Sequence, residues 1–186
     1  MIRRLLVVLC VPIGIQACAI GNPQYPVNWD PLVPSASADC KHFEGSYADR
    51  GQTRDDLTVR SLTRELFGYR EEWRTATRVQ LAFLSDDVLQ ATIWAGDKKV
   101  SERNLHAATG DFACEAGQLA LRDRRWVAED LVAGHENVTI ELYDQGNQIV
   151  ALVKEFTFAV AFLVVPFVAD APHWYRFQRL KVSSGR

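Results

Sequence analysis

The sequence predicts a mainly β fold, an antiparallel barrel or sandwich with one short early helix, which follows a signal peptide and a proline-rich tether. Apolar and polar residues alternate in several short runs, of which Thr77–Leu84 is the clearest. Alternation of this kind is typical of strands with one buried face. Turn sequences such as Ser85-Asp86-Asp87 and Asp144-Gln145-Gly146-Asn147 separate the runs, which indicates antiparallel hairpins.

One helix is expected before these strands, over residues 57–67. Apolar residues of this segment fall near one face, as they do in an amphipathic helix. Asp55 or Asp56 can cap the start of the helix, and Gly68 ends it.

The later runs predict the remaining strands. In chain order these are 88–95, a hairpin over 108–123, then 125–134, 136–144, 148–153 and 173–182. The apolar run Phe156–Val168 contains Pro166 and is too short for a membrane helix, which needs about 20 residues. We expect this run to form a strand that is buried on both faces.

The first residues predict export. Arg3 and Arg4 precede the apolar run Leu5–Ile15. A short apolar run behind positive charge is typical of a secretory signal, because it cannot span a bilayer as a helix.

The end of this signal has two alternative cleavage sites. Ile15-Gln16-Ala17-Cys18 resembles the motif of bacterial lipoprotein signals, although its second residue is usually small. The resemblance implies removal of residues 1–17 and a lipid on Cys18. Ala17-Cys18-Ala19 is also an ordinary A-x-A site. Cleavage after Ala19 instead leaves the protein free in the periplasm.

Residues 18–39 form the tether, and residues 40–186 form a single β domain. Four of the seven prolines fall in the tether, where proline favours extended chain. Such a spacer holds a domain up to ~60 Å from a membrane at about 3 Å per residue. Tyr25 and Trp29 are unusual in a spacer, and they either pack on the domain or contact lipid or a partner.

The cysteines predict a disulfide, and the net charge bears on the kind of partner that the protein binds. Cys40 and Cys114 remain beside Cys18 in the exported chain, an even pair in an oxidising compartment, and they are expected to form a disulfide. Loss of Arg3 and Arg4 with the signal leaves 19 basic and 23 acidic side chains, a net charge of about −4. This charge argues against a nucleic-acid partner.

No catalytic motif stands out, and we predict no catalytic residue, metal or cofactor. The four histidines form no H-E-x-x-H pattern. His42 and Glu44 share one strand face, but two residues do not make a metal site. Ser46 lacks the G-x-S-x-G setting of a nucleophile. Arg60 and Arg64 are interpreted as part of a solvated helix face.

The arrangement resembles a group of uncharacterised proteobacterial lipoproteins. The shared elements are Ile15-Gln16-Ala17-Cys18, Tyr25-Pro26 with Trp29, Cys40 with Gly45 and Tyr47, Ser61-Leu62 with Leu66-Phe67, Asp111 and Cys114 with Gly117 and Leu119, and Trp174-Tyr175-Arg176-Phe177. The resemblance brings no known activity with it.

A weaker resemblance is to lipocalins, some of which are bacterial outer-membrane lipoproteins. Gly45-Ser46-Tyr47 is similar to their first-strand glycine-x-tryptophan, with tyrosine in place of tryptophan. The resemblance implies that an arginine of the last strand, Arg176 or Arg179, packs over Tyr47. The early helix departs from the lipocalin pattern.

These observations predict a non-enzymatic lipoprotein of the cell envelope that binds or scaffolds. Ala19 follows Cys18 in place of the aspartate that retains lipoproteins in the inner membrane. By that resemblance the protein is expected on the periplasmic face of the outer membrane, with an envelope protein as a possible partner. The alternatives are a lipocalin-like carrier of a small apolar ligand and, less favoured, an envelope hydrolase.

Overall fold

The computed structural model describes residues 24–33, 37–53, 59–129, 132–161 and 165–181. Its strands are β1 Gly45–Ala48, β2 Arg50–Thr53, β3 Val59–Ser61, β4 Arg78–Ser85, β5 Val88–Ala95, β6 Lys98–His106, β7 Phe112–Glu115, β8 Gln118–Glu129, β9 Val132–Asp144, β10 Gln148–Ala161 and β11 Val165–Leu180. Its helical elements are η1 Lys41–Phe43, α1 Leu62–Phe67, η2 Glu71–Trp73 and η3 Ala107–Thr109. The predicted class is therefore confirmed: the fold is mainly antiparallel β with a short early helix.

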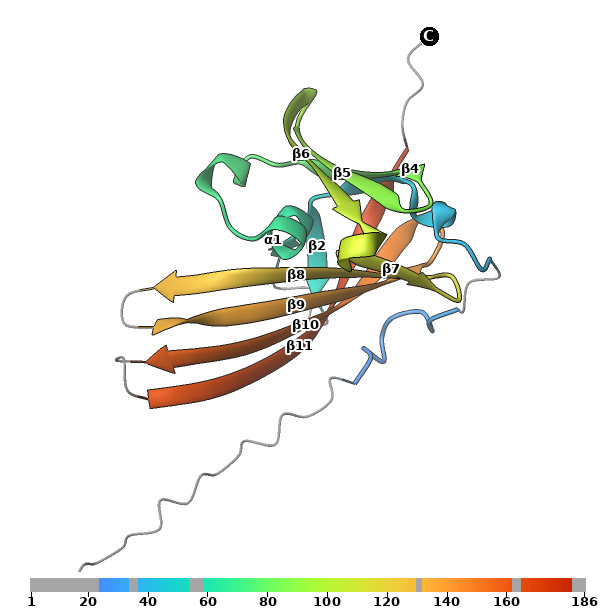
Figure 1. The fold of residues 1–186 in the computed structure, drawn as a ribbon. Helices are drawn as coiled ribbons and strands as arrows, with labels where there is room; N and C mark the ends of the chain where they lie inside the picture. Colours follow the sequence, from blue (N-terminus) through green and yellow to red (C-terminus); the bar gives the residue numbers. More distant parts are fainter. Residues whose placement is uncertain (1–23, 34–36, 54–58, 130–131, 162–164, 182–186) are drawn as a thin grey trace, which may run out of the picture.

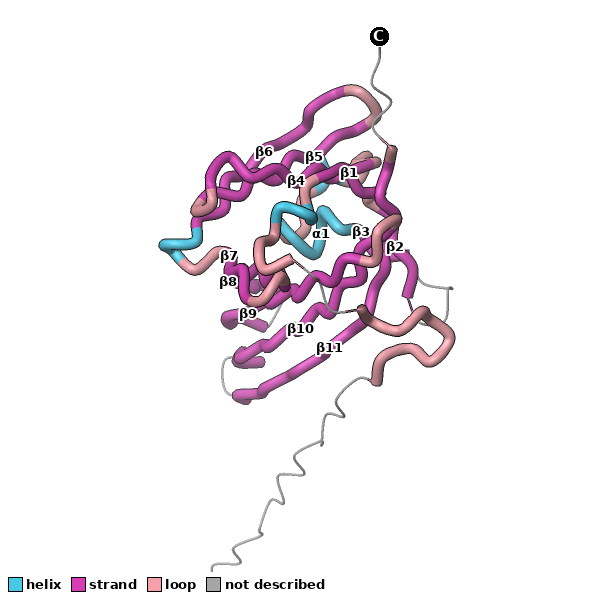
Figure 2. Tube along the Cα trace, turned by 90° about the vertical axis from the view of Figure 1, so that its right-hand side faces the viewer, coloured by secondary structure: helices cyan, strands magenta, loops and turns pink. Residues whose placement is uncertain are grey.

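The strands pair in the order β6-β5-β4-β1-β11-β10-β9-β8-β7, and β2 joins β3 to β11. The sheet bends sharply at β1 and β11. As Figure 1 shows, the bend separates a short arm of β4, β5 and β6 from a long arm of β8 to β11, with α1 between the two arms. Figure 2 shows the same arrangement from the side.

The two edge strands of the sheet, β6 and β7, form no ladder with each other in the described backbone. Side chains make the contacts between the two ends of the sheet. The rings of Phe83 and Phe112 meet edge-on, with centroids 6.0 Å apart. Arg103 Nη1 lies 3.3 Å from Asp123 Oδ1, which joins β6 to β8. The sheet is thus bent around its core without being closed into a barrel by hydrogen bonds.

The core lies between the arms. Its largest fully buried side chains include Phe43, Tyr47, Leu62, Leu81 and Phe177. These residues come from η1, β1, α1, β4 and β11, so each arm and the helix contribute to one apolar cluster. Burying apolar side chains of this size contributes about 1.5–3 kcal/mol each to folding.

An arginine of the last strand packs over Tyr47, as the lipocalin resemblance implies. The guanidinium of Arg179 lies 5.3 Å from the centroid of the Tyr47 ring. Its Nη2 donates to the carbonyl of His42 at 2.8 Å and to Asp144 Oδ1 at 3.1 Å. Arg179 therefore joins η1, β1 and the end of β9 at the bend of the sheet.

The helix begins later than the sequence indicates. Its N-cap is Ser61, whose Oγ accepts from the Arg64 amide at 3.2 Å. A second cap comes from Asp49, because its Oδ1 accepts from the Thr63 amide at 2.8 Å and from Ser61 Oγ at 3.0 Å. The predicted caps, Asp55 and Asp56, lie outside the described residues, and Val59–Ser61 is a strand.

Gly68 ends the helix as predicted. Its φ of 82° lies in the left-handed region, which glycine adopts without strain, and its amide donates to the Arg64 carbonyl at 2.9 Å. None of the described helices is long and apolar enough to cross a membrane.

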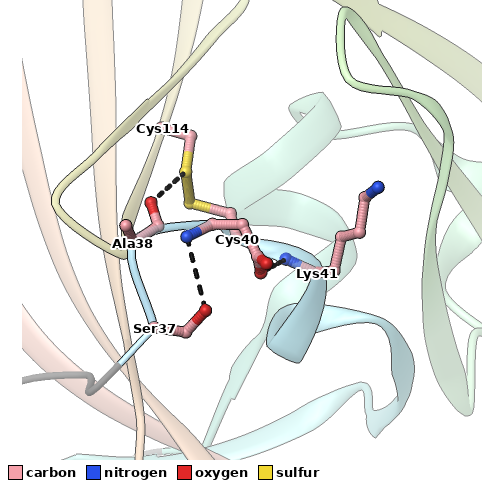
Figure 3. Close-up of a disulfide and its surroundings, with 6 residues drawn as sticks. Ser37, Ala38, Cys40, Lys41 and Cys114 are labelled. Carbon is pink, nitrogen blue, oxygen red and sulfur yellow. Dashed lines mark hydrogen bonds between the residues drawn. A yellow bond between two sulfur atoms is a disulfide. The ribbon is translucent and has the colours of Figure 1, made fainter.

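A disulfide joins Cys40 to Cys114, with Cα atoms 6.0 Å apart (Figure 3). Cys40 is buried just before η1, and Cys114 is exposed on β7. The bond therefore fastens the start of the domain to an edge strand that pairs only with β8 among the described strands.

Candidate functional site

Part of the predicted tether lies against the outer surface of the long arm. The Tyr25 ring meets the Trp174 ring edge-on at 5.1 Å between centroids, and meets the Trp29 ring edge-on at 6.0 Å. The guanidinium of Arg176 covers Trp29 at 5.1 Å from the ring centroid. Trp29 is only 6% exposed. Tyr25 and Trp29 were expected either to pack on the domain or to contact lipid or a partner. In the structure they pack on the domain.

Hydrogen bonds fix the same segment. The Tyr25 hydroxyl donates to the Asp30 carbonyl at 2.6 Å. The side-chain amide of Gln145, in the turn between β9 and β10, donates to the carbonyls of Asp30 and Pro31, each at 3.2 Å. Residues 25–31 thus belong to the domain surface, and the free spacer is shorter than the sequence indicates.

The shortened spacer limits the position of Cys18, which lies outside the described residues. Six peptide units join Cys18 to Gln24, the first described residue. A fully extended chain of that length spans at most about 20 Å. A lipid on Cys18 would therefore lie within about 20 Å of the outer face of the long arm, in place of the ~60 Å expected from the sequence.

The outer face of the long arm is apolar at its far end. The strand register aligns Trp126, His135, Phe158 and Val168 in one row across β8, β9, β10 and β11. Trp126 is 63% exposed, Phe158 51% and Val168 58%, and the adjacent Phe156 is 45% exposed. We call Trp126, Phe156, Phe158 and Val168 the apolar face.

The apolar face corrects one prediction. The run Phe156–Val168 was expected to form one strand buried on both faces, but it spans the end of β10 and the start of β11. Its described residues Phe156, Phe158 and Val168 are exposed because they lie on the outer face of the long arm, whereas α1 packs on the inner face, between the two arms (Figure 1). Exposed apolar side chains gathered on one surface are typical of a docking site.

The inner face of the long arm is charged at the corresponding level. Arg125 Nε lies 2.7 Å from Asp123 Oδ2, and Arg125 Nη1 lies 3.8 Å from Glu136 Oε2. Arg125 Nη2 also donates to the Glu65 carbonyl of α1. The side chains of all three ion-pair members are about one-fifth exposed or less. At this level of the arm, the inner face therefore carries charged groups, and the outer face carries the apolar row at Trp126.

Glu65 of α1 faces these charges and is 3% exposed. Loss of solvent raises the pKa of its carboxyl to about 7, and the negative charge of Glu155 adds to the effect. The neighbouring guanidinium groups of Arg60, Arg125 and Arg64 act in the opposite direction without offsetting the burial.

We predict that Glu65→Gln makes the protein less sensitive to pH. The folded carboxyl has a pKa of about 7 against an ordinary value of 4.5, so the folded state binds the extra proton between these values. The free energy of unfolding of the wild type therefore falls as pH rises from 4.5 through 7, by at most about 3 kcal/mol. The variant lacks this fall, which urea unfolding at pH 4.5, 6 and 8 measures.

Glu115→Gln, at an exposed position of β7, is the matched control for that series. It should leave the pH dependence of the wild type in place. An equal slope for Glu65→Gln and the wild type would contradict the prediction.

The remaining predicted candidates are not brought together. Glu44 Oε1 accepts from the Phe83 amide at 2.8 Å, and His42 packs on the Phe43 ring at 4.3 Å between centroids. Ser46 is buried in β1. Among the described residues, no three histidine, cysteine or acidic side chains lie close enough to hold a metal ion. The sequence pattern did not predict the apolar face. Alternation of apolar and polar residues shows which side chains share a face of a strand, but it does not show whether a second layer covers that face.

No family model matches this chain, and neither a curated protein nor a solved structure shows significant similarity to it.

Proposed function

We propose that this protein is a lipid-anchored, non-enzymatic protein of the cell envelope, acylated on Cys18 and lying on the periplasmic side of the outer membrane. We further propose that its apolar face rests on the bilayer that holds the anchor. The observation that supports this proposal is the packed segment at Tyr25 and Trp29, because a lipid on Cys18 would then lie on the same side of the domain as the apolar face.

The distances support this orientation. Trp174, where the tether packs, and Val168 lie six residues apart on β11, which is about 20 Å at the rise of a strand. The chain between Cys18 and Gln24 spans at most the same distance. The lipid can therefore enter a bilayer that also contacts the end of the long arm.

The side chains of the apolar face suit the boundary between lipid and water. Tryptophan is enriched at that boundary, since its ring is apolar and its N–H is polar. Arg122 and Arg124 are exposed on the same outer face of β8. Lys154 of β10 is paired there with Glu141, and Asp170 of β11 is exposed opposite Phe156. Cationic side chains around an apolar surface favour anionic lipid headgroups.

The alternative is a lipocalin-like carrier of a small apolar ligand. A carrier needs an open apolar cavity, and such a cavity belongs between the arms of the sheet. Leu62 and Leu66 of α1 are buried in that space and pack into the core cluster. For this reason we favour docking through the outer face over carriage in the interior.

The proposal predicts that Trp126 contacts lipid. The acylated protein is reconstituted into vesicles of phosphatidylethanolamine and phosphatidylglycerol with brominated acyl chains, which quench tryptophan fluorescence on contact. We expect strong quenching in the wild type, loss of the quenched component in Trp126→Phe, and at least twofold weaker quenching in Phe156→Ser/Phe158→Ser. The Cys18→Ser variant should bind the same vesicles at least tenfold more weakly.

Leu84→Ser is the matched control, since Leu84 is 58% exposed on the short arm. It should be quenched like the wild type. Equal quenching in Phe156→Ser/Phe158→Ser and in the wild type would contradict docking through the apolar face. An intact mass of the native protein without acyl chains on Cys18 would contradict the anchor separately.

A further inference from the structure

A second surface lies on the opposite side of α1 from the core. It is a pocket of about 220 Å³ enclosed by β2, β3, α1 and the segment that follows Gly68. Five arginines line it, namely Arg50, Arg60, Arg64, Arg70 and Arg74. This concentration of positive charge contrasts with the acidic balance of the whole chain, whose net charge is −2.

Three of these guanidinium groups form no ion pair with a carboxylate of the described residues. Arg70 lies 3.6 Å from Glu72 Oε1, and Arg74 lies 2.7 Å from Glu71 Oε1, so these two are paired. In the described part of the chain, Arg50, Arg60 and Arg64 have no carboxylate within ion-pair distance. Among the described residues, the pocket therefore holds three guanidinium groups outside ion-pair distance of any carboxylate, although Arg60 and Arg64 interact with Glu65 of α1.

Asp49 is the acidic residue of the pocket wall, and it does not supply the missing charge at the surface. It is 1% exposed, and its carboxylate accepts from Ser61 Oγ and from the Thr63 amide. Its role is to hold the first turn of α1 in place. Asp49 thereby fixes the backbone of Thr63 directly. It also holds Ser61, whose hydroxyl accepts from the Arg64 amide.

Thr63 provides a second and independent indication of a ligand. The residue is 1% exposed and lines the pocket, and its Oγ1 has no hydrogen-bond partner among the described residues. A buried hydroxyl without a partner costs about 1–3 kcal/mol. Thr63 Oγ1 has almost no accessible surface, so the Thr63 side chain would rotate for a ligand oxygen in the pocket to accept its hydrogen bond.

Aromatic rings lie against three of the arginines, and Arg60 lies over the Tyr175 ring at 6.0 Å from the centroid. Arg64 lies over the Tyr69 ring at 5.9 Å from the centroid, and Arg70 lies over the Trp73 ring at 5.0 Å. Such contacts limit the motion of a guanidinium while leaving its N–H groups free to donate. The rings thus restrict the positions of these guanidinium groups at the pocket.

We infer that this pocket binds a phosphate group, through the guanidinium groups of Arg50, Arg60 and Arg64 and the hydroxyl of Thr63. Guanidinium groups match the oxygens of phosphate in geometry and form strong paired hydrogen bonds with them. The volume lies below the roughly 300–1,000 Å³ of pockets that hold drug-sized ligands, so the bound part is small. The phosphate is either free or the headgroup of a phospholipid, and this inference does not depend on the lipid anchor.

Titration calorimetry of the Cys18→Ser chain with inorganic phosphate, and with phosphatidylglycerol vesicles in a parallel arm, tests the inference. At least one arm should show saturable binding that Arg50→Ala/Arg64→Ala weakens at least tenfold. Binding of inorganic phosphate identifies a free ligand. Binding of the vesicles alone identifies a headgroup only where Arg50→Ala/Arg64→Ala weakens it, because the apolar face also binds vesicles under the proposed function. Arg122→Ala/Arg124→Ala, on the outer face of β8, should leave binding of inorganic phosphate unchanged.

Thr63→Val separates binding from folding. It removes a hydroxyl without a partner and keeps the shape of the side chain, so the unliganded melting temperature should not fall. Phosphate affinity should fall severalfold in the arm that binds. Absence of binding in both arms would overturn the inference, as would unchanged affinity in Arg50→Ala/Arg64→Ala.

Discussion

Replacing both Cys40 and Cys114 by serine is expected to lower the free energy of unfolding by about 4 kcal/mol. The two residues are 74 positions apart, and a crosslink across a loop of that length removes much of the entropy of the unfolded chain. The value is a large part of the 5–15 kcal/mol typical of a domain. Urea unfolding of the wild type and of Cys40→Ser/Cys114→Ser measures the difference.

The wild type in reductant provides the internal control, because Cys114 is exposed and a thiol can reach the bond. Reduction should shift the wild type to the midpoint of the double variant and leave the variant unchanged. Equal midpoints for the oxidised wild type and the double variant would show that the bond contributes nothing to stability.

Trp29→Ala is expected to release the tether from the domain. A buried tryptophan contributes about 3–5 kcal/mol relative to alanine, and here that energy holds residues 24–33 in place. The amide of residue 29 donates to the Pro26 carbonyl at 3.1 Å. Hydrogen exchange of this segment should therefore accelerate at least a hundredfold, while exchange in β9 and β10 changes little.

Val27→Ala is the control in the same segment, since Val27 is 90% exposed. It should exchange like the wild type. If Trp29→Ala also left exchange unchanged, the packed segment would not depend on its tryptophan. In the acylated protein, release of the segment should also weaken the quenching of Trp126 by brominated lipid, because the longer spacer no longer holds the apolar face at the bilayer.

The strands were predictable because their signal is local. Apolar Val79 and Leu81 alternate with polar residues within a few positions. The turn at Asp144–Asn147 is indicated by four adjacent residues. The start of α1 was not predictable in this way. Its second cap comes from Asp49, 14 residues before the amide that it accepts from, and no local pattern indicates that contact.

The apolar face and the arginine-lined pocket could not be predicted from the sequence, for related reasons. Phe156 and Phe158 look like core residues because their sequence is apolar, and they are exposed because they lie on the outer face of the long arm, away from α1 and the core. Arg60 and Arg64 look like a solvated helix face. Arg60 lies instead on β3, and the bend after Gly68 brings Arg70 to the same pocket.

The pairing of β1 and β2 with β11 has a consequence for the timing of folding. Ser46 pairs with Leu180, and Gln52 pairs with Arg176, so strands from the two ends of the domain must meet before the sheet is complete. Contacts so distant in sequence make folding slow. A ribosome still adding residues near β11 therefore holds a chain that cannot yet close its sheet.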